Sequence, residues 1–275
     1  MPLKKPAGRT KHLALGWKPS LPDHRDLMFS VGLPTLQNLP SSVDLRGPNC
    51  PPILDQGDIG SCTANALSAA VQFDRRKNGD TPDFTPSRLF IYYNERQIEG
   101  TIPTDAGANL RDGIQSLANQ GVCPETEWPY DDTAGDSQTH AFPVGSPPVT
   151  QPPQQSYDDA ANYKIVSYQS ITQDLSQLRG ALAQGFPFVM GFTVYGSWYN
   201  VEPVPTTITL PTGDDTSIGG HAVMIVGYDD STQLFTVQNS WGTGVGDNGY
   251  FYMPYSYITN SNLASDFWMI QTTTA

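Results

Sequence analysis

The clearest periodic pattern in the chain follows Cys62, where apolar residues recur at the spacing of one helix face. The residues that carry it are Ala66, Leu67, Ala70, Val71 and Phe73. This spacing predicts a helix over residues 62–78 that ends at Gly79. Two further helices are predicted over residues 87–98 and 109–120, the first after a proline and the second before a glycine.

The second half of the chain is rich in strand patterns. Short apolar runs between turn residues predict strands over residues 163–168, 188–194, 219–228, 235–242 and 249–253. The spacing Ser170-x-x-Gln173 resembles a capping box and predicts a helix that begins there and ends at Gly185. A Pro-rich stretch from residue 131 to about 155 is predicted to join the two halves as a loop.

The composition is that of a soluble globular protein. The chain has 275 residues, 38% of them apolar, and a mean hydropathy of −0.37. No apolar run reaches the length of about 18 residues that a membrane span needs, so no membrane partner is expected. The net charge of −12 argues against a nucleic-acid partner, because phosphate binding needs a basic surface. Nothing in the sequence implies a metal or organic cofactor, and the oligomeric state stays open.

The N-terminal stretch is basic and broken by proline and glycine. Residues 1–20 have no continuous apolar segment, so we see no ordinary secretory signal and favour a cytoplasmic location over export. Residues 1–40 are interpreted as an extension, either a short plug along a cleft or a strap across the back of the fold. Of the three cysteines, Cys50 and Cys123 either form one disulfide or are both reduced.

Cys62 is the first candidate for chemistry. It closes a Gly-rich turn that starts at Gln56, and it opens the first predicted helix. Unpaired N–H groups and the positive end of the helix dipole favour a thiolate at such a position. A buried structural cysteine on a core helix is the alternative interpretation.

Two distant segments favour the nucleophile. One predicted strand starts near His221, and the next strand ends near Asn239 after a short turn. An antiparallel hairpin would bring these two residues side by side. A cysteine, a histidine base and an amide that orients the base form a nucleophilic catalytic set. Gln56 would offer a side-chain N–H to an oxyanion, beside the backbone N–H of Cys62.

These motifs resemble the papain family of cysteine peptidases. The matching stretches are residues 56–62, 220–228, 239–244 and 249–250. The chain departs from the family at Ile59, where a cysteine is usual, at Thr63, where an aromatic residue is usual, and at Val245, where a second tryptophan is usual. The sequence Gly-Ser-Cys-Thr-Ala-Asn-Ala around Cys62 resembles a divergent, largely microbial branch of the family.

The resemblance implies an α+β, two-lobed papain-like fold, with the active-site cleft between a helical lobe and an antiparallel β-rich lobe. We expect a peptidase domain over residues 41–275, with a helical lobe over about 56–130 and a β-rich lobe over about 156–275. Such a cleft between two lobes is a preferred place for a site.

The resemblance also implies an endopeptidase that works on peptide or protein substrates through a thioester on Cys62. His221 would be the base, Asn239 would orient it, Trp241 would shield their contact, and Gln56 would bind the oxyanion. The candidate substrate-binding residues are Gly107, Ala108, Asn109, Leu110, Gly191, Ala222, Trp241 and Asp266. Ser265 or Asp266 would close the base of the pocket. If Asp266 faces into the pocket, basic side chains are expected to bind there; if it does not, a medium-sized apolar side chain is expected.

Two rival functions stay open at the level of sequence. One is a catalytically silent papain-like module that binds peptides or mediates adhesion. The other is an acyl transferase or peptide ligase that uses the same thioester, because Thr63 and Val245 alter the side of the cleft where water or an amine enters.

Overall fold

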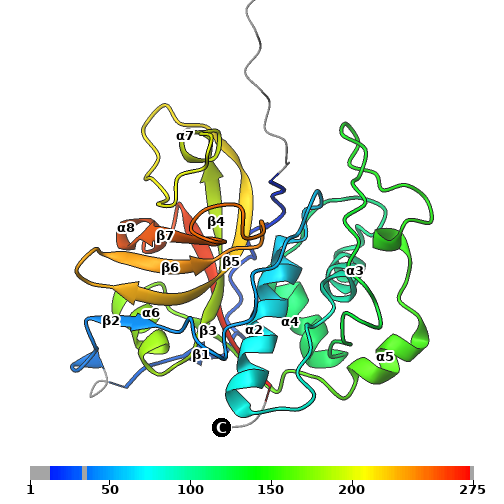
Figure 1. Cartoon of the computed structure of the whole chain (residues 1–275), viewed down its shortest axis with the longest axis horizontal. Coiled ribbons are helices and arrows are strands. Elements are labelled where there is room, and N and C mark those ends of the chain that lie inside the picture. The colour runs from blue at the N-terminus through cyan, green and yellow to red at the C-terminus, as the bar shows by residue number, and fades with distance from the viewer. Residues whose placement is uncertain (1–12, 33–35, 273–275) are drawn as a thin grey trace, which may run out of the picture.

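The computed structural model describes residues 13–32 and 36–272, and it has the expected two-part α+β organisation (Figure 1). Three helices, α2 (Cys62–Asn78), α3 (Arg88–Glu99) and α4 (Leu110–Asn119), pack together in one half. A mostly antiparallel sheet fills the other half. Helix α2 lies where the two halves meet and packs directly against strand β5 of the sheet.

The sheet of the described residues has eight strands in the order β1-β3-β8-β4-β5-β6-β7, with β2 paired to β5. The strands are β1 (Met28–Phe29), β2 (Ser42–Asp44), β3 (Ser167–Ile171), β4 (Phe188–Tyr195), β5 (Ser217–Asp229), β6 (Leu234–Gln238), β7 (Tyr250–Pro254) and β8 (Ala264–Gln271). Among the strand pairs of this described sheet, β1 and β3 pair in parallel and the others are antiparallel. Strand β5 is central because residues 221–228 are buried without interruption, which suits a strand covered on both faces.

The helical half confirms the three predicted helices. Helix α2 ends at Gly79 with φ 74°, and α3 ends at Gly100 with φ 71°. Both glycines adopt the left-handed conformation in which a side chain would be strained. The end at Gly79 was predicted from the sequence, whereas α3 was predicted to end at Ile98 without reference to Gly100. The side chain of Ser87 caps α3 by accepting a hydrogen bond from the Phe90 N–H.

The helix predicted to begin at Ser170 was placed wrongly. Ser170 lies in β3, and helix α6 (Leu175–Ala183) begins later, after Asp174. The Asp174 carboxylate accepts hydrogen bonds from two N–H groups of the first turn, so it replaces Ser170 as the cap. Gln173 instead donates its side-chain N–H to two backbone carbonyls. One is that of Ile258, the last residue of α8 (Tyr255–Ile258), and the other is that of Ala264, the first residue of β8.

The strand predicted over residues 163–168 was also shifted. Strand β3 occupies residues 167–171, because its pairing with β8 starts only at Ser167. Ile165, which was assigned to the strand, is buried in the core shared with the helical half. The Pro-rich stretch predicted as a loop contains a 3-10 turn, η1 (Pro147–Val149), and runs into α5 (Gln154–Ala160).

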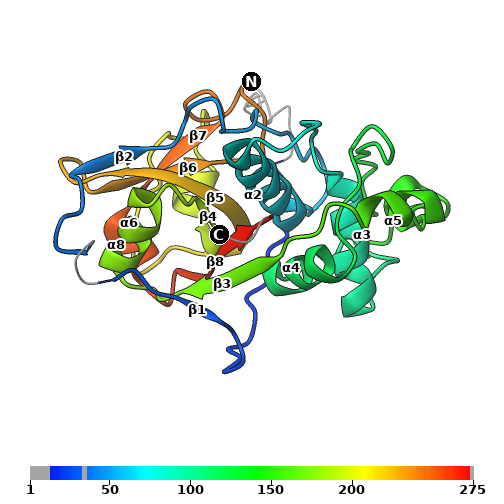
Figure 2. The same ribbon diagram turned by 90° about the horizontal axis from the view of Figure 1, so that it is seen from below.

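Two apolar clusters hold the halves together. One lies inside the sheet half, where α6 and α8 flank the strands (Figure 2) and the short helix α7 (Gly196–Tyr199) contributes Trp198. The other is built on α2, α3 and α4 and continues onto the sheet through Val189, Ala222, Met224 and Trp268. This shared cluster therefore fixes the start of α2 against the start of the buried part of β5.

Within the part of the chain that the structure describes, none of the helices is long and apolar enough to cross a membrane.

Candidate active site

Cys62 is the first residue of α2 and is completely buried. Backbone and side-chain contacts hold the turn before it. Tyr130 donates its hydroxyl to the Gln56 carbonyl at 2.8 Å and contacts the Ser61 hydroxyl at 2.6 Å. The N–H of Gly60 donates to both oxygens of Asp105 at 3.0 Å. The turn that presents Cys62 is thus tied to the helical half at both of its ends.

His221 and Asn239 meet across the β5–β6 hairpin. The ring nitrogen Nε2 of His221 lies 2.6 Å from Oδ1 of Asn239, and both residues are buried. The hairpin register pairs Met224 with Gln238, which brings the residue that follows β6 close to His221. The other ring nitrogen of His221, Nδ1, has no hydrogen-bond partner among the described residues.

Trp241 covers the ring of His221. The two rings stack with centroids 4.5 Å apart and planes inclined by 21°. Trp241 is almost completely buried, so it keeps water from one face of the imidazole.

Gln56 is oriented by a residue that the sequence analysis did not single out. Ser240 donates its hydroxyl to Oε1 of Gln56 at 2.7 Å. This contact turns the Gln56 amide nitrogen toward two carbonyls, those of Ile59 at 3.0 Å and Ala14 at 3.2 Å. The signal for Ser240 was its position directly after Asn239, but its partner lies 184 residues away in the chain.

Burial determines the protonation states of Cys62 and His221. It raises the pKa of the Cys62 thiol to about 12, against the opposing effect of backbone N–H groups of Ala222, Gly16 and Thr63 that face the sulfur. Burial also lowers the pKa of His221 to about 4, although the contact with Asn239 acts in the opposite direction. In this structure both groups are therefore neutral at neutral pH.

Residues 13–20, which we call the cleft segment, lie directly on these groups. In Figure 1 this dark blue segment runs between the sheet and α2. The N–H groups of Gly16 and Trp17 both donate to the carbonyl of Gly220 at 3.0 Å. The Lys18 N–H donates to the Ala108 carbonyl at 3.0 Å, and the Ala108 N–H donates to the Gly16 carbonyl at 2.8 Å. The segment therefore pairs with both sides of the cleft at once.

Gly16 marks the narrowest point of the cleft segment. A β-carbon at Gly16 would lie 1.8 Å from the carbonyl oxygen of Gly60. A β-carbon at Gly107, which has φ 66°, would lie 1.9 Å from the Gly16 oxygen. Only glycine allows these two backbones to approach so closely.

Trp17 fills a pocket next to the cleft. Its indole Nε1–H donates to Oδ2 of Asp266 at 3.1 Å, and the Ser20 N–H donates to the same oxygen at 2.8 Å. A β-carbon at Gly191 would lie 1.8 Å from the indole ring, so this glycine makes room for it. Burial raises the pKa of Asp266.

The remaining predicted substrate residues lie around this pocket or behind it. Ala222 pairs with Gly191 between β5 and β4. Leu110 is fully buried in the helical core. The backbone and side-chain N–H groups of Asn109 donate to Glu99, at 2.7 and 3.1 Å.

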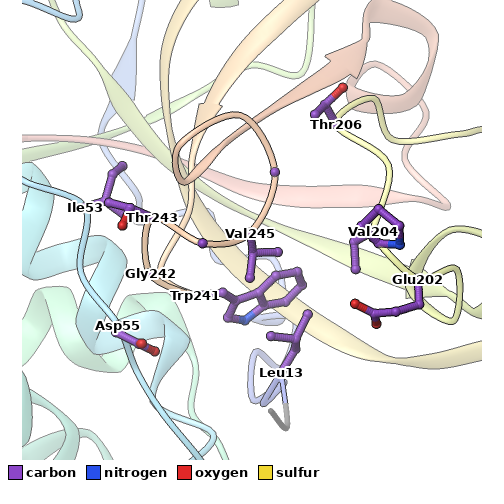
Figure 3. Close-up of a pocket in the computed structure, with 13 residues that line it drawn as sticks. Leu13, Ile53, Asp55, Glu202, Val204, Thr206, Trp241, Gly242, Thr243 and Val245 are labelled. Atoms are coloured by element: carbon purple, nitrogen blue, oxygen red, sulfur yellow. The ribbon is translucent and has the colours of Figure 1, made fainter. Parts of the chain in front are cut away.

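A cavity of about 690 Å³ opens on the other side of Trp241 (Figure 3). Leu13, at the start of the cleft segment, forms part of its wall together with Trp241 and Val245. Asp55 and Glu202 are the two carboxylates that line it. The cleft segment therefore spans the site from this cavity to the pocket of Trp17.

The cysteines other than Cys62 form no disulfide. Cys50 and Cys123 are both free thiols, which answers the alternative left open by the sequence. The Cys50 thiol donates to Oε1 of Gln238 at 3.0 Å, and burial raises the pKa of both thiols.

Comparisons with known proteins agree with this geometry. The family model described as "Papain family cysteine protease" matches residues 39–269. A protein of Acanthamoeba polyphaga mimivirus, named an uncharacterized peptidase C1-like protein, is 38% identical over 94% of this chain and 87% of its own length. Cathepsin B-like cysteine proteinase 4 of Caenorhabditis elegans is 27% identical over 90% of this chain and 78% of its own.

Among solved structures, Xylellain, a cysteine protease from Xylella fastidiosa, superposes with a TM-score of 0.92. The two sequences are 50% identical, and the match spans 98% of this chain and 100% of the Xylellain chain. Procathepsin B of Trypanosoma congolense shares the fold, with a TM-score of 0.68 at 18% identity. The match spans 94% of this chain and 87% of the procathepsin chain.

The two-lobed fold and the family match together define a thiol-dependent hydrolase of peptide bonds. The chain belongs to the papain family of cysteine proteases. It is a cysteine-type peptidase, and its substrates are peptides or proteins.

Proposed function

We propose that the chain is an endopeptidase that hydrolyses peptide bonds through a thioester on Cys62, with His221 as base and Asn239 as its orienting partner. The observation that carries this proposal is the buried contact of 2.6 Å between His221 Nε2 and Asn239 Oδ1. That contact leaves Nδ1 without a hydrogen-bond partner among the described residues, and the Cys62 sulfur faces the N–H of Ala222, the residue after His221. We infer that Nδ1 accepts the Cys62 proton.

The steps of the reaction follow from these positions. Cys62 gives its proton to His221, and the thiolate attacks the carbonyl carbon of the scissile bond. The carbon–nitrogen bond then breaks, and the imidazolium donates its proton to the leaving amine. A water molecule attacks the thioester while His221 accepts its proton, which releases the acid and restores the thiol.

Gln56 and the backbone N–H of Cys62 would stabilise the oxyanion. In this structure Gln56 Nε2 already donates to a carbonyl, that of Ala14, at 3.2 Å. Trp241 Nε1 donates to the same oxygen at 3.2 Å. The N–H groups of Gln56 and Trp241 are therefore already oriented toward a carbonyl oxygen before substrate binds, which is what electrostatic preorganisation requires.

The test is covalent labelling followed by intact-mass measurement with a peptide-like epoxide. We expect one label on the wild-type chain and none on Cys62→Ala, with Cys50→Ala as the matched control that is labelled normally. Products formed from a peptide substrate with and without an added amine separate hydrolysis from ligation. Labelling that persists in Cys62→Ala, or cleavage by that variant, would refute the assignment.

We further propose that residues 1–40 form an N-terminal extension whose cleft segment closes the site of the peptidase domain, residues 41–275, between its helical lobe (about 56–130) and its β-rich lobe (about 156–275). Support comes from the pairing of Gly16 and Lys18 with both walls and from the burial of Cys62. The segment runs from the cavity beside Val245, on the leaving-group side, to Asp266. A substrate would run the opposite way, so the segment can fill the cleft without offering a bond in the orientation for attack.

Asp266 is proposed to select the side chain two residues before the cut. Its carboxylate already accepts hydrogen bonds from Trp17 Nε1 and Ser20 N within a pocket that Gly191 leaves open. Once the cleft segment leaves, a cationic side chain of a substrate would satisfy the same oxygens. We therefore expect a preference for arginine or lysine at that position, with Gly107, Ala108, Asn109, Leu110 and Ala222 forming the surrounding wall.

A further inference from the structure

A buried carboxyl group lies behind the candidate nucleophile and has no role in the mechanism above. Glu95, on α3, has no solvent exposure. Thr63, the residue directly after Cys62, donates its hydroxyl to Oε2 of Glu95 at 2.8 Å. The other oxygen, Oε1, has no hydrogen-bond partner among the described residues. Glu95 thus contacts the first turn of α2 with one oxygen and leaves the other unpaired.

The surrounding helices are shaped around this carboxyl group. Gly113 of α4 faces it, and a β-carbon there would lie 2.3 Å from Oε1 of Glu95 and 2.4 Å from Leu67. The carboxyl group is therefore enclosed by α2, α3 and α4 in a space that a side chain at position 113 would remove.

The charges that face Glu95 oppose its ionisation. Burial is the main cause that raises its pKa well above the usual range, and the carboxylates of Glu99 on α3 and Asp112 on α4 add to this. The hydrogen bond from Thr63 acts in the opposite direction but does not outweigh burial. Arg96 is the one cation among these causes that acts in the opposite direction, but its guanidinium is engaged by backbone carbonyls. Lys18 of the cleft segment pairs with Glu99 at 3.1 Å.

The charge state of Glu95 affects the pKa values of two further groups, Cys62 and Tyr92. Ionised Glu95 would raise the pKa of the Cys62 thiol and that of Tyr92 on α3. A negative charge at Glu95 would therefore disfavour the thiolate that the reaction needs. A neutral acid at the same place avoids this and can still accept the Thr63 hydroxyl.

We propose that Glu95 is a positioning residue: as a neutral carboxylic acid it holds Thr63, and through Thr63 the first turn of α2, without placing a charge behind Cys62. This proposal rests on the assignment of Cys62 as the nucleophile. It follows that ionisation of Glu95 at alkaline pH lowers the fraction of Cys62 present as thiolate, because the added negative charge raises the pKa of the thiol.

The test compares Glu95→Gln with the parent chain, both carrying Trp17→Ala to expose Cys62. Glutamine keeps the volume and accepts the Thr63 hydroxyl, but it cannot ionise. The readout is the rate of Cys62 alkylation by iodoacetamide from neutral to alkaline pH, followed by peptide mass, with Cys50 and Cys123 as internal references. We expect equal rates near neutral pH and a Glu95→Gln rate that becomes about three- to tenfold higher as the parent acid ionises.

Variants of Thr63 test the hydroxyl that donates to Glu95. Thr63→Val should lower kcat for a peptide substrate about tenfold with little change in KM, because the buried oxygen of Glu95 loses its donor. Thr63→Ser restores the hydroxyl and should restore kcat. Equal melting temperatures of the Val and Ser variants would show that the change in kcat is not a loss of folding.

The outcomes separate the two proposals. A ratio of alkylation rates that stays constant with pH, or a failure of Thr63→Ser to restore kcat, refutes the role of Glu95. If no variant alkylates Cys62 faster than Cys50 and Cys123, the nucleophile assignment itself fails and takes this proposal with it.

Discussion

Removing the Trp17 side chain should open the active site. Trp17 is 7% exposed, lies against Gly191 and Gly220, and donates its indole N–H to Asp266 at 3.1 Å. Truncating a buried tryptophan to alanine typically costs about 3–5 kcal/mol. Because the cleft segment is the part that can leave, we expect this loss to weaken closure rather than to unfold the domain.

The size of the effect follows from that free energy. Each 1.4 kcal/mol changes an equilibrium about tenfold, so Trp17→Ala should raise the open fraction about 100- to 4000-fold. When closing is fast, the rate of Cys62 labelling by an epoxide is proportional to this fraction and should rise by the same factor. Trp17→Phe keeps the ring but loses the N–H, and it should raise the rate about ten- to 100-fold.

Leu21→Ala is the matched control for this experiment. Leu21 lies just after the cleft segment but its side chain is 83% exposed, so its removal should leave the labelling rate unchanged. If Trp17→Ala is labelled no faster than the parent chain or Leu21→Ala, the cleft segment does not limit access to Cys62, and the proposal of a closed site is wrong.

Three further predictions concern the same groups. Because the buried Cys62 thiol has a pKa of about 12, its labelling in the intact chain should rise about tenfold for each unit of pH above neutrality, and in Trp17→Ala it should level off at a lower pH; a plateau near neutral pH in the intact chain would contradict this. Gln56→Ala should lower kcat about 100- to 1000-fold, measured on a fluorogenic peptide in the opened chain, because one oxyanion donor is lost; a change of less than about threefold would exclude Gln56 as such a donor. Asp266→Asn should reduce kcat/KM about ten- to 100-fold for peptides with arginine two residues before the cut and leave peptides with leucine there unchanged; equal losses for both would remove the charge-based selection.

Local patterns in the sequence were enough for the helical half. The apolar periodicity after Cys62 and the glycine at position 79 act within one helix, so the structure that they predict does not depend on the rest of the fold. The prediction at Ser170 failed for the opposite reason. Two residues competed for the same cap, and the pairing of β3 with β8 decided in favour of Asp174.

The candidate site divides in the same way. Cys62, His221 and Asn239 were found from the sequence because each stands in a distinctive local motif, and the hairpin that joins two of them is short enough to be predicted. Their catalytic roles stay predictions. Ser240 as the partner of Gln56 could not be found, since that contact joins residues 184 positions apart.

The sequence by itself therefore determined the family, the two-lobed α+β class and the residues that form the candidate nucleophile, base and orienting amide. Only the tertiary structure decided what covers and surrounds them: the cleft segment over Cys62, Trp17 on Asp266, and Glu95 behind Thr63. The physical reason is that motifs and periodicity are properties of neighbouring residues. Burial and the pKa values that follow from it depend on chain segments that meet only after folding.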